Sequence, residues 1–426
     1  MAMKPLDCLR ATVFGMVSAG IVLTIGAADS RGAETMRRFS VANYRDRMAA
    51  GWIGQMAGVG WGRPTEFRFN ARIIPADKVP EWTPEMINQY RQDDLYVEMT
   101  FLRTLEQYGL DCSIRQAGID FANSRFRLWH ANRFGRLNLR RGIAPPDSGH
   151  PKFNQHADDI DYQIEADYAG LIAPGMPNLG IELGEKFGRL MNYGDGLYGG
   201  QFVAGMYCEA FFESDPTRIV EAGLKCIPHD SQYAECIRDV LAWHQEYPND
   251  WHATWKHIDE KYQRNPAYRR FSCRKGDFNI DAKINGAYIV LGLLYGNREP
   301  DNTIILSMRC GLDSDCNPSN AGGVLFTTIG RAKLPERFTS ALNTNEKFIH
   351  TPYTFAELLD VCEVLARKAV VRAGGRVEQA DDGEVFVIPV EPARPGRLEQ
   401  SWEPGPPADS HFTEVEKKQI VVKPKE

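Results

Sequence analysis

The chain has 426 residues, of which 43% are hydrophobic and 25% are charged, and its formal net charge is −6 at pH 7. These values describe an ordinary globular protein that is long enough for one large core or two smaller ones. The mildly acidic balance gives no indication of a nucleic-acid-binding protein.

Residues 1–28 are predicted to form a signal peptide. Basic residues near the start precede an apolar run, and the run ends in small residues of the kind that a signal peptidase requires, Gly26-Ala27-Ala28. The alternative is an uncleaved membrane anchor, because the run is near the lower length limit for spanning a bilayer. We expect cleavage near Asp29, export to the periplasm or the extracellular space, and no stable membrane insertion of the mature chain.

The cysteine content is compatible with export. One of the nine cysteines, Cys8, lies in the predicted signal peptide, which leaves an even number that permits disulfides in an oxidising compartment. Buried free thiols are an equal alternative. The cysteines do not have the spacing of a zinc module, because the chain has no C-x-x-C motif.

The pattern between residues 36 and 375 is helical. Apolar residues recur at the spacing of one helix face in two clear places, Met48-Trp52-Ile53-Met56 and Leu95-Met99-Leu102-Leu105. Thr354 and Glu357 have the spacing of a capping box, and Gly374-Gly375 ends the last long helix. We therefore predict one all-α domain over residues 36–375.

Two regions depart from this pattern. Residues 125–162 are rich in arginine and proline, which predicts a long irregular excursion of the kind that often shapes a substrate pocket. Its arginines either bind an anionic group or form a solvated surface. Residues 376–426 are predicted to form a C-terminal extension with a short strand at 385–390 and a mostly flexible tail, because residues 391–426 contain too few apolar residues to pack.

Two acidic doublets stand where helices are expected to begin. One is Asp93-Asp94 and the other is Asp313-Ser314-Asp315. The helix dipole stabilises a carboxylate at a helix N-terminus by about 0.3–1 kcal/mol, which explains one acid per helix but explains adjacent acids poorly. Four converging carboxylates repel one another unless a cation is present, so the doublets predict a divalent metal site.

Small residues are expected to let these helix ends meet. Ala321-Gly322-Gly323 follows the second doublet, and the helix before Glu66 contains many small residues, namely Gly51, Gly54, Ala57, Gly58 and Gly60. Tight packing of that helix would leave the Glu66 carboxylate at the end of a core helix. By itself, Glu66 would be a solvated loop residue.

Several short motifs follow one another in order along the chain. They are residues 49–58, Pro64-Thr65-Glu66-Phe67, Asp93-Asp94, Ile172-Ala173-Pro174, Tyr198-Gly199-Gly200, residues 311–317 and Ala321-Gly322-Gly323. This ordered set resembles the ADP-ribosylglycohydrolase family over roughly residues 45–333. The resemblance implies an all-α orthogonal helical bundle with a cleft for two Mg²⁺ or Mn²⁺ ions, and hydrolysis of the bond between the anomeric carbon of ribose and a modified side chain or other leaving group.

The resemblance also implies roles for particular residues. The metal ligands would be Glu66, Gln92, Asp93, Asp94, Asp313, Asp315 and Cys316, and the catalytic residues would be Glu66, Asp94, Asp313 and Asp315. Gln92 and Cys316 stand where the family has a threonine or serine hydroxyl. Gln92 offers a hard amide oxygen but is longer than threonine, and a neutral thiol is a weak ligand for magnesium. We therefore expect one metal position to be altered or unoccupied.

Four substrate-binding residues are implied in the same way, Tyr193, Asp195, Gly199 and Gly200. The family often has Thr-His-Gly-Asp where this chain has Asn192-Tyr193-Gly194-Asp195, which implies a different grip on the adenosine diphosphate part of the substrate. The acid-rich stretch at residues 156–167 is interpreted as a polar loop, with a catalytic role as the alternative.

The function implied by the resemblance is a metal-dependent glycoside hydrolase that acts on a small-molecule or protein-linked sugar. ADP-ribosylated proteins are chiefly intracellular, whereas export is expected here. An exported furanosidase that acts on another ribose-like sugar is therefore an alternative. A non-catalytic descendant is a further alternative, because some relatives of the family are lens crystallins.

Overall fold

The structure is a computed structural model, and it describes residues 35–422. The predicted signal peptide and its cleavage position near Asp29 lie outside the described residues. All statements below concern the described part of the chain.

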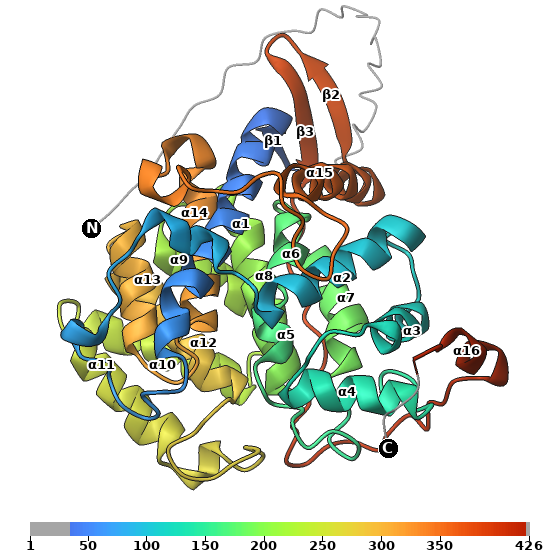
Figure 1. The fold of residues 1–426 in the computed structure, drawn as a ribbon, viewed down its shortest axis with the longest axis horizontal. Coiled ribbons are helices and arrows are strands. Elements are labelled where there is room, and N and C mark those ends of the chain that lie inside the picture. The colour runs from blue at the N-terminus through green and yellow to red at the C-terminus, as the bar shows by residue number, and fades with distance from the viewer. Residues whose placement is uncertain (1–34, 423–426) are drawn as a thin grey trace, which may run out of the picture. The chain divides into compact units, whose positions relative to one another are not determined.

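The described chain is mainly helical, with 16 α-helices and one small sheet (Figure 1). In chain order the helices are α1 (Val41–Gly62), α2 (Asp93–Tyr108), α3 (Ile114–Asn123), α4 (His130–Arg140), α5 (Asp161–Ile164), α6 (Asp167–Leu171), α7 (Pro177–Phe187), α8 (Asp195–Ala210), α9 (Pro216–Leu224), α10 (Gln232–Glu246), α11 (Trp251–Ile258), α12 (Ala282–Tyr295), α13 (Pro300–Arg309), α14 (Cys316–Ile329), α15 (Phe355–Arg372) and α16 (Glu414–Gln419). The predicted all-α fold is confirmed.

Strands that precede and follow the helical region in sequence form one three-stranded antiparallel sheet. Its strands are β1 (Met36–Ser40), β2 (Arg376–Ala380) and β3 (Gly383–Pro389), and they lie in the order β1-β3-β2. Figure 1 shows β2 and β3 projecting as a hairpin beside α15. Phe386 and Ile388 of β3 are fully buried. The strand predicted at residues 385–390 is therefore present, with slightly different ends.

A stripe of glycines lets α1 pack closely against α14. A Cβ atom added to Gly54 would lie 2.4 Å from the carbonyl oxygen of Gly322, and one added to Gly62 would lie 2.0 Å from the carbonyl oxygen of Ser314. Gly58 is equally close to the backbone at the start of α14. Backbone atoms cannot move aside as a flexible side chain can, so this contact requires glycine. The end of α1 consequently meets the start of α14.

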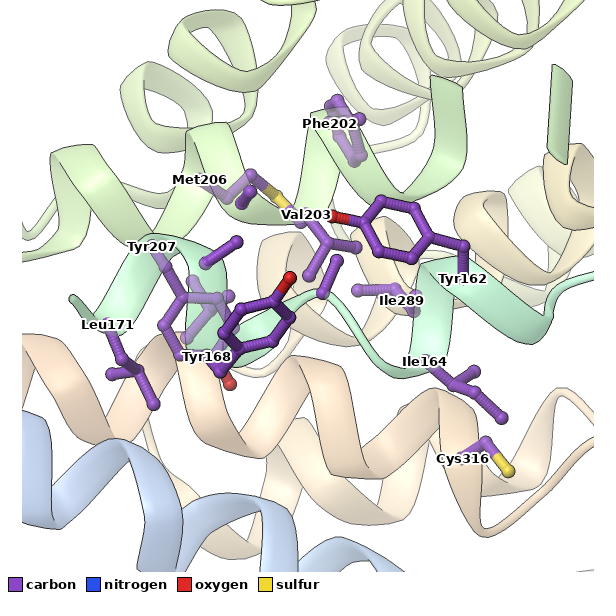
Figure 2. Close-up of a cluster of buried hydrophobic side chains, with 14 of the residues drawn as sticks. Tyr162, Ile164, Tyr168, Leu171, Phe202, Val203, Met206, Tyr207, Ile289 and Cys316 are labelled. Carbon is purple, nitrogen blue, oxygen red and sulfur yellow. The ribbon is translucent and has the colours of Figure 1, made fainter. Parts of the chain in front are cut away.

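A buried cluster of aromatic and aliphatic side chains adjoins the start of α14. Figure 2 shows Tyr168 of α6 and Tyr207 of α8 in this cluster, with Cys316 at its edge. Both tyrosines are fully buried. The Tyr207 hydroxyl donates a hydrogen bond to Asp167, and Asn320 of α14 donates to the other oxygen of the same carboxylate at 2.7 Å. These paired polar groups connect α6, α8 and α14 inside the core.

The expectation of a mostly flexible tail is wrong for residues 391–422, which pack against the helices. Phe412 and Ile420 are 2% and 4% exposed, and the buried Ser401 hydroxyl donates to Asp158. The carboxylate of Asp147 accepts hydrogen bonds from the backbone of this segment at residues 408 and 410, both at 2.8 Å. The segment is thus held by a few apolar anchors and by polar side chains of the domain, which its own composition does not indicate.

The eight cysteines between residues 35 and 422 are free thiols, and all but Cys273 are buried. Of the two alternatives for these residues, the structure therefore has unpaired thiols. In the same part of the chain, every helix is too short or too polar to cross a bilayer.

Candidate functional site

A cavity of about 240 Å³ lies where the end of α1 and the starts of α2 and α14 come together. Its lining consists of Glu66, Phe67, Gln92, Asp93, Trp129, His130, Ile160, Asp161, Ile164, Arg274, Phe278, Ile280, Asp313, Asp315 and Cys316. We call one part of it the acidic side, defined as Glu66, Asp93, Asp94, Asp313 and Asp315, with Asp94 buried behind the lining. We call the other part the loop side, defined as Trp129, His130, Ile160, Arg274 and Phe278.

The two predicted acidic doublets meet on the acidic side. The amide nitrogen Nε2 of Gln92 donates a hydrogen bond to Asp315 Oδ2 at 3.2 Å. The thiol of Cys316 donates to Asp94 Oδ1, also at 3.2 Å. Each contact joins residues that are more than two hundred positions apart in sequence. Gln92 and Cys316 thus connect one doublet to the other.

Burial raises the pKa of every carboxyl group on the acidic side, and repulsion between the carboxylates adds to this for all of them except Asp315. Burial is the largest cause for Glu66, followed by the charges of Asp315 and Asp93, and its pKa rises to about 8. Burial raises the pKa of Asp93 to about 7. The pKa values of Asp94 and Asp313 lie well above the ordinary range for the same reasons. A divalent cation would relieve this repulsion, because an adjacent positive charge favours the ionised form.

Two buried oxygen atoms on the acidic side are free to accept a cation. Asp94 Oδ2 and Asp313 Oδ1 have no hydrogen-bond partner among the described residues. Ligand atoms of Asp313, Asp315 and Cys316 lie within 4.8 Å of one another. Carboxylate oxygens are the ligands that Mg²⁺ and Mn²⁺ prefer, so these residues fit such an ion. Cys316 fits less well, because burial raises the pKa of its thiol and keeps it neutral.

The backbone around the cavity adopts unusual conformations at three non-glycine residues. The φ angles of Phe67, His130 and Leu312 are 50°, 34° and 57°, in the left-handed region. The Phe67 N–H donates to the Leu312 carbonyl at 3.0 Å, which ties the segment after α1 to the second doublet. Such conformations cost about 1–3 kcal/mol each and cluster at functional sites, which supports a functional assignment for this cavity.

The loop side contains residues that the sequence analysis did not identify individually. Residues 125–162 were predicted to shape a pocket, and their two ends supply Trp129, His130 and Ile160 to the lining. A separate loop before α12 supplies Arg274 and Phe278. No helical or strand period marks these positions, so only the resulting fold identifies them.

The exposed arginines of the same excursion agree with the solvated-surface alternative, and they are Arg125, Arg127, Arg133 and Arg141, whereas Arg136 and Arg140 fit neither alternative. Arg136 donates to the carbonyl of Phe126 and Arg140 donates to the carbonyl of Ala122, both at 2.8 Å. These two side chains therefore support the backbone between α3 and α4. None of the arginines between residues 125 and 141 is part of the cavity lining.

The interpretation of residues 156–167 as a polar loop is wrong, because its acids are buried. The residues at most 4% exposed include Asp158, Asp159, Asp161, Glu165 and Asp167. Asp161 accepts hydrogen bonds from the backbone N–H groups of Ala131 and Asn132 at 3.1 and 2.9 Å, and so stabilises the start of α4. Burial raises the pKa of Asp161 to about 6, and its side chain also lines the cavity.

Two of the four residues predicted to bind substrate, Tyr193 and Asp195, lie outside the cavity lining. The Tyr193 hydroxyl accepts a hydrogen bond from the N–H of Gly405 at 3.4 Å, in the C-terminal segment. Asp195 forms a buried ion pair with Lys283 at 3.3 Å and accepts a hydrogen bond from the Tyr233 N–H at 3.1 Å. These contacts do not support substrate binding by either residue at this cavity.

The other two, Gly199 and Gly200, serve the packing of α8 against α5. A Cβ atom on Gly199 would lie 2.5 Å from Oε1 of Gln163, and one on Gly200 would lie 2.2 Å from the ring of Tyr162. Neither glycine is in the cavity lining. Their lack of a side chain is explained by helix packing, so the predicted substrate contact has no support here either.

Comparisons with known proteins agree with the order of motifs along the chain. The sequence model of the ADP-ribosylglycohydrolase family matches residues 40–374. A search of curated proteins found no match. A solved structure described as an ADP-ribosylglycohydrolase-related protein complex aligns with 77% of this chain and 99% of its own, at 13% sequence identity and a TM-score of 0.50, which shows similarity of fold. Because the family match spans more than half of its residues, this chain belongs to the ADP-ribosylglycohydrolase family.

Proposed function

We propose that this protein is a metal-dependent glycoside hydrolase that cleaves a ribosyl bond, with Mg²⁺ or Mn²⁺ as its cofactor. The observation that carries the proposal is the pair of unpartnered buried oxygens, Asp94 Oδ2 and Asp313 Oδ1, within a group of carboxyl groups whose pKa values are all raised. A buried carboxylate without a partner is costly unless a cation binds it. The family membership supports hydrolysis of a glycosidic bond as the reaction.

The residues that would hold an ion are Asp93, Asp94, Asp313 and Asp315, with the side-chain oxygen of Gln92 as a further donor. A bound ion of this kind orients the hydroxyl groups of the sugar and makes a coordinated water more acidic. The carboxylates themselves place negative charge beside the position where the anomeric carbon becomes positively charged in the transition state.

Glu66 is the residue best suited to move a proton. Its side chain lines the cavity beside the second doublet, and burial followed by the charges of Asp315 and Asp93 raises its pKa to about 8. A carboxyl group whose pKa lies near the working pH can both accept and return a proton. We therefore assign Glu66 as the acceptor of the proton that the attacking water loses.

Phe67, Arg274 and Phe278 of the lining would hold the sugar and its substituent. The rings of Phe67 and Phe278 lie 5.2 Å apart between centroids, and both line the cavity, where they offer apolar faces to a sugar ring. The guanidinium of Arg274 lies 5.2 Å from the centroid of the Phe278 ring and supplies a positive charge to the lining. That charge suits a phosphate-bearing substrate such as an ADP-ribosyl group.

One observation favours a smaller substrate as the second candidate. The cavity of about 240 Å³ is smaller than the roughly 300–1,000 Å³ of pockets that enclose drug-sized ligands. A single furanose ring fits this volume better than a complete ADP-ribose does. A furanosidase that acts on another ribose-like sugar is therefore the alternative substrate class.

The decisive experiment compares two substrates and one variant. Release of ADP-ribose from ADP-ribosylated protein is measured beside release of sugar from furanosides, with Mg²⁺ or Mn²⁺ present and after chelation. We expect turnover of one substrate class, its loss on chelation, and its loss in Asp315→Asn with the domain still folded. Unchanged turnover in Asp315→Asn refutes the proposal. No turnover of either class, together with no change in Tm on adding Mg²⁺ or Mn²⁺, identifies a non-catalytic descendant.

We also propose that the mature protein acts in the periplasm or the extracellular space. The support for this is the apolar run that ends in Gly26-Ala27-Ala28. N-terminal sequencing of the protein from fractionated cells should give a first residue near Asp29 outside the cytoplasm. An intact N-terminus in the cytoplasmic fraction contradicts the proposal.

A further inference from the structure

A second group of ligand-type side chains lies beside the cavity, and its composition differs from that of the acidic side. It consists of His130, His156, Asp159 and Cys273, which we call the histidine–cysteine cluster, and one ligand atom of each lies within 4.8 Å of the others. Nδ1 of His130 and Nδ1 of His156 lie 3.2 and 2.6 Å from the same atom, Asp159 Oδ2. Three separate segments of the chain therefore converge on one carboxylate.

The carboxylate at the centre of the cluster is held in place and is incompletely satisfied. The Asp159 side chain is fully buried, and its second oxygen, Oδ1, has no hydrogen-bond partner within residues 35–422. The Asp159 backbone pairs with Asp281 and accepts a hydrogen bond from Asn192 Nδ2 at 2.8 Å, so the residue cannot turn away. A buried, unpartnered oxygen at a fixed position points to a ligand that the described residues do not supply.

The conformation of His130 gives further support. Its φ of 34° lies in the left-handed region, where a residue with a side chain is strained by about 1–3 kcal/mol. The surrounding contacts keep its ring beside Asp159 in spite of that cost. Strain of this kind is typical of residues that are positioned for binding.

The donor set identifies the class of ion. Two imidazole nitrogens, one carboxylate oxygen and one cysteine sulfur are typical zinc ligands, whereas Mg²⁺ and Mn²⁺ prefer oxygen atoms. Tetrahedral zinc with bonds of about 2.0–2.3 Å separates its ligand atoms by about 3.3–3.8 Å. The separations of 2.6 and 3.2 Å from Asp159 Oδ2 lie near these values and no ligand atom is more than 4.8 Å from another, so small side-chain rotations suffice.

We propose that the histidine–cysteine cluster is a structural zinc site, separate from the Mg²⁺ or Mn²⁺ site of the proposed function. Four protein ligands complete a tetrahedral shell and leave no position for water or substrate, which distinguishes structural from catalytic zinc. Its ligands come from the start of α4, the loop before α5 and the loop before α12. The ion cross-links these three segments.

The cross-link fixes the loop side of the cavity. His130 is itself in the lining, and two other ligands are direct sequence neighbours of lining residues, in the pairs Asp159-Ile160 and Cys273-Arg274. Holding the ligands therefore holds the side chains that face the cavity. The zinc site shapes the pocket without taking part in the reaction.

Zinc binding by the purified full-length protein tests the proposal without any substrate. After metal removal, Zn²⁺ is titrated against a chromogenic chelator. We expect one tightly bound equivalent per chain, and at least about 10- to 100-fold weaker binding in Cys273→Ser and in His156→Gln, because losing even an outer-shell partner costs that much. His252→Gln, which changes an exposed histidine outside the cluster, is the matched control and should bind as the unchanged protein does.

Cobalt distinguishes the two cysteines that could supply a sulfur ligand. With Co²⁺ in place of Zn²⁺, a sulfur-to-metal charge-transfer band should appear, should be lost in Cys273→Ser and should remain in Cys316→Ser. The opposite pattern assigns the sulfur ligand to the acidic side and overturns the proposal. Circular dichroism of each variant confirms that it is folded.

Further outcomes distinguish failure of the zinc proposal from failure of the proposed function. Failure of the unchanged protein to take up Zn²⁺ leaves only two histidines lying beside Asp159 and overturns the proposal, whatever the enzyme assays give. Retention of Zn²⁺ by Asp315→Asn supports it, and that retention is expected even if no glycoside is cleaved. Loss of tight Zn²⁺ binding in Asp315→Asn places the ion on the acidic side and overturns it.

Discussion

The side chains of the acidic side lie at or near helix ends, whereas those of the loop side lie mostly on irregular segments. The acidic side places carboxyl groups at the starts of α2 and α14 and depends on the glycine contact between α1 and α14. The loop side has aromatic rings on irregular segments, and the histidine–cysteine cluster lies on the same segments. These segments meet only in the folded chain. Helix packing thus fixes the first group of side chains, and contacts between distant loops fix the second.

The proposed function requires the acidic side for turnover, and a substitution at Asp94 tests this requirement. In Asp94→Asn we expect turnover to fall at least about 10³-fold, which corresponds to about 4 kcal/mol of transition-state stabilisation. Because Asp94 is buried among like charges, the same change should leave the Tm of the metal-free protein unchanged or raised. Steady-state kinetics and thermal unfolding measure the two effects.

The matched control for this change is Asp382→Asn in the exposed turn between β2 and β3, which should alter neither turnover nor Tm. Unfolding of Asp94→Asn would show instead that the carboxylate has a structural role.

The glycine contact that positions the acidic side can be broken separately. In Gly58→Ala the added Cβ atom would lie 2.3 Å from the backbone nitrogen of Ser319, so α1 and α14 must move apart. We expect the free energy of unfolding to fall by about 1–3 kcal/mol, the usual cost of overpacking. Denaturant unfolding measures it. Gly396→Ala, where the nearest atom is a flexible side chain at 3.7 Å, should change stability little, and equal losses in both variants would contradict the argument.

The pH dependence of stability should differ between the metal-free and the metal-bound protein, because the carboxyl groups of the acidic side are buried. The folded-state pKa values of Glu66 and Asp93 are raised to about 8 and about 7, mainly by burial. Protonation therefore stabilises the fold below the unfolded-state pKa values of about 4, and this stabilisation is lost as pH rises through the folded-state values. We expect the Tm of the metal-free protein to fall as the pH rises from about 4 to about 8 and to level off above that.

Two additions test the origin of that fall. Glu66→Gln should flatten its upper part, and Mn²⁺ at pH 8 should restore the Tm of the unchanged protein, because bound positive charge favours the ionised carboxylates. A metal-free Tm that stays constant or rises over this range would contradict the assigned pKa directions.

The smallest effect is expected where residues 391–422 pack against the domain, outside the cavity lining. Arg115 forms a two-pronged ion pair with Glu416, with both N–O distances at 2.6 Å. Both side chains are partly exposed, so Arg115→Gln should cost only about 0.2–1 kcal/mol of stability. Limited proteolysis should nevertheless cleave the C-terminal segment sooner in this variant. Arg218→Gln, which removes an exposed ion pair elsewhere, should not change that rate.

The acidic side could be predicted from the sequence because its signals are local. Both doublets stand at expected helix starts. The many small residues of the helix before Glu66 indicated that this helix packs closely and brings Glu66 to the doublets. The loop side could not be predicted in the same detail, since Trp129 and Phe278 have no periodic pattern and approach the cavity only through tertiary contacts. A single cysteine gives no spacing motif, so Cys273 carried no metal signal in the sequence.

The expectation of a flexible tail failed for a physical cause of the same kind. Low apolar content suggested a flexible tail, but side chains of the domain such as Asp147 supply the hydrogen bonds that hold it. The substrate role that the resemblance implies for Tyr193 stays a prediction, and its hydroxyl contacts the C-terminal segment, which lies beyond the resemblance.

The glycine stripe of α1 also makes the length of this helix a constraint. One residue inserted between Gly54 and Gly58 would rotate the later glycine away from α14 by about 100° and advance it by about 1.5 Å, so that side chains would take its place. Insertions in the surface loops meet no such obstacle. Length variation in relatives that keep this contact between α1 and α14 should therefore fall between the helices and spare the interior of α1.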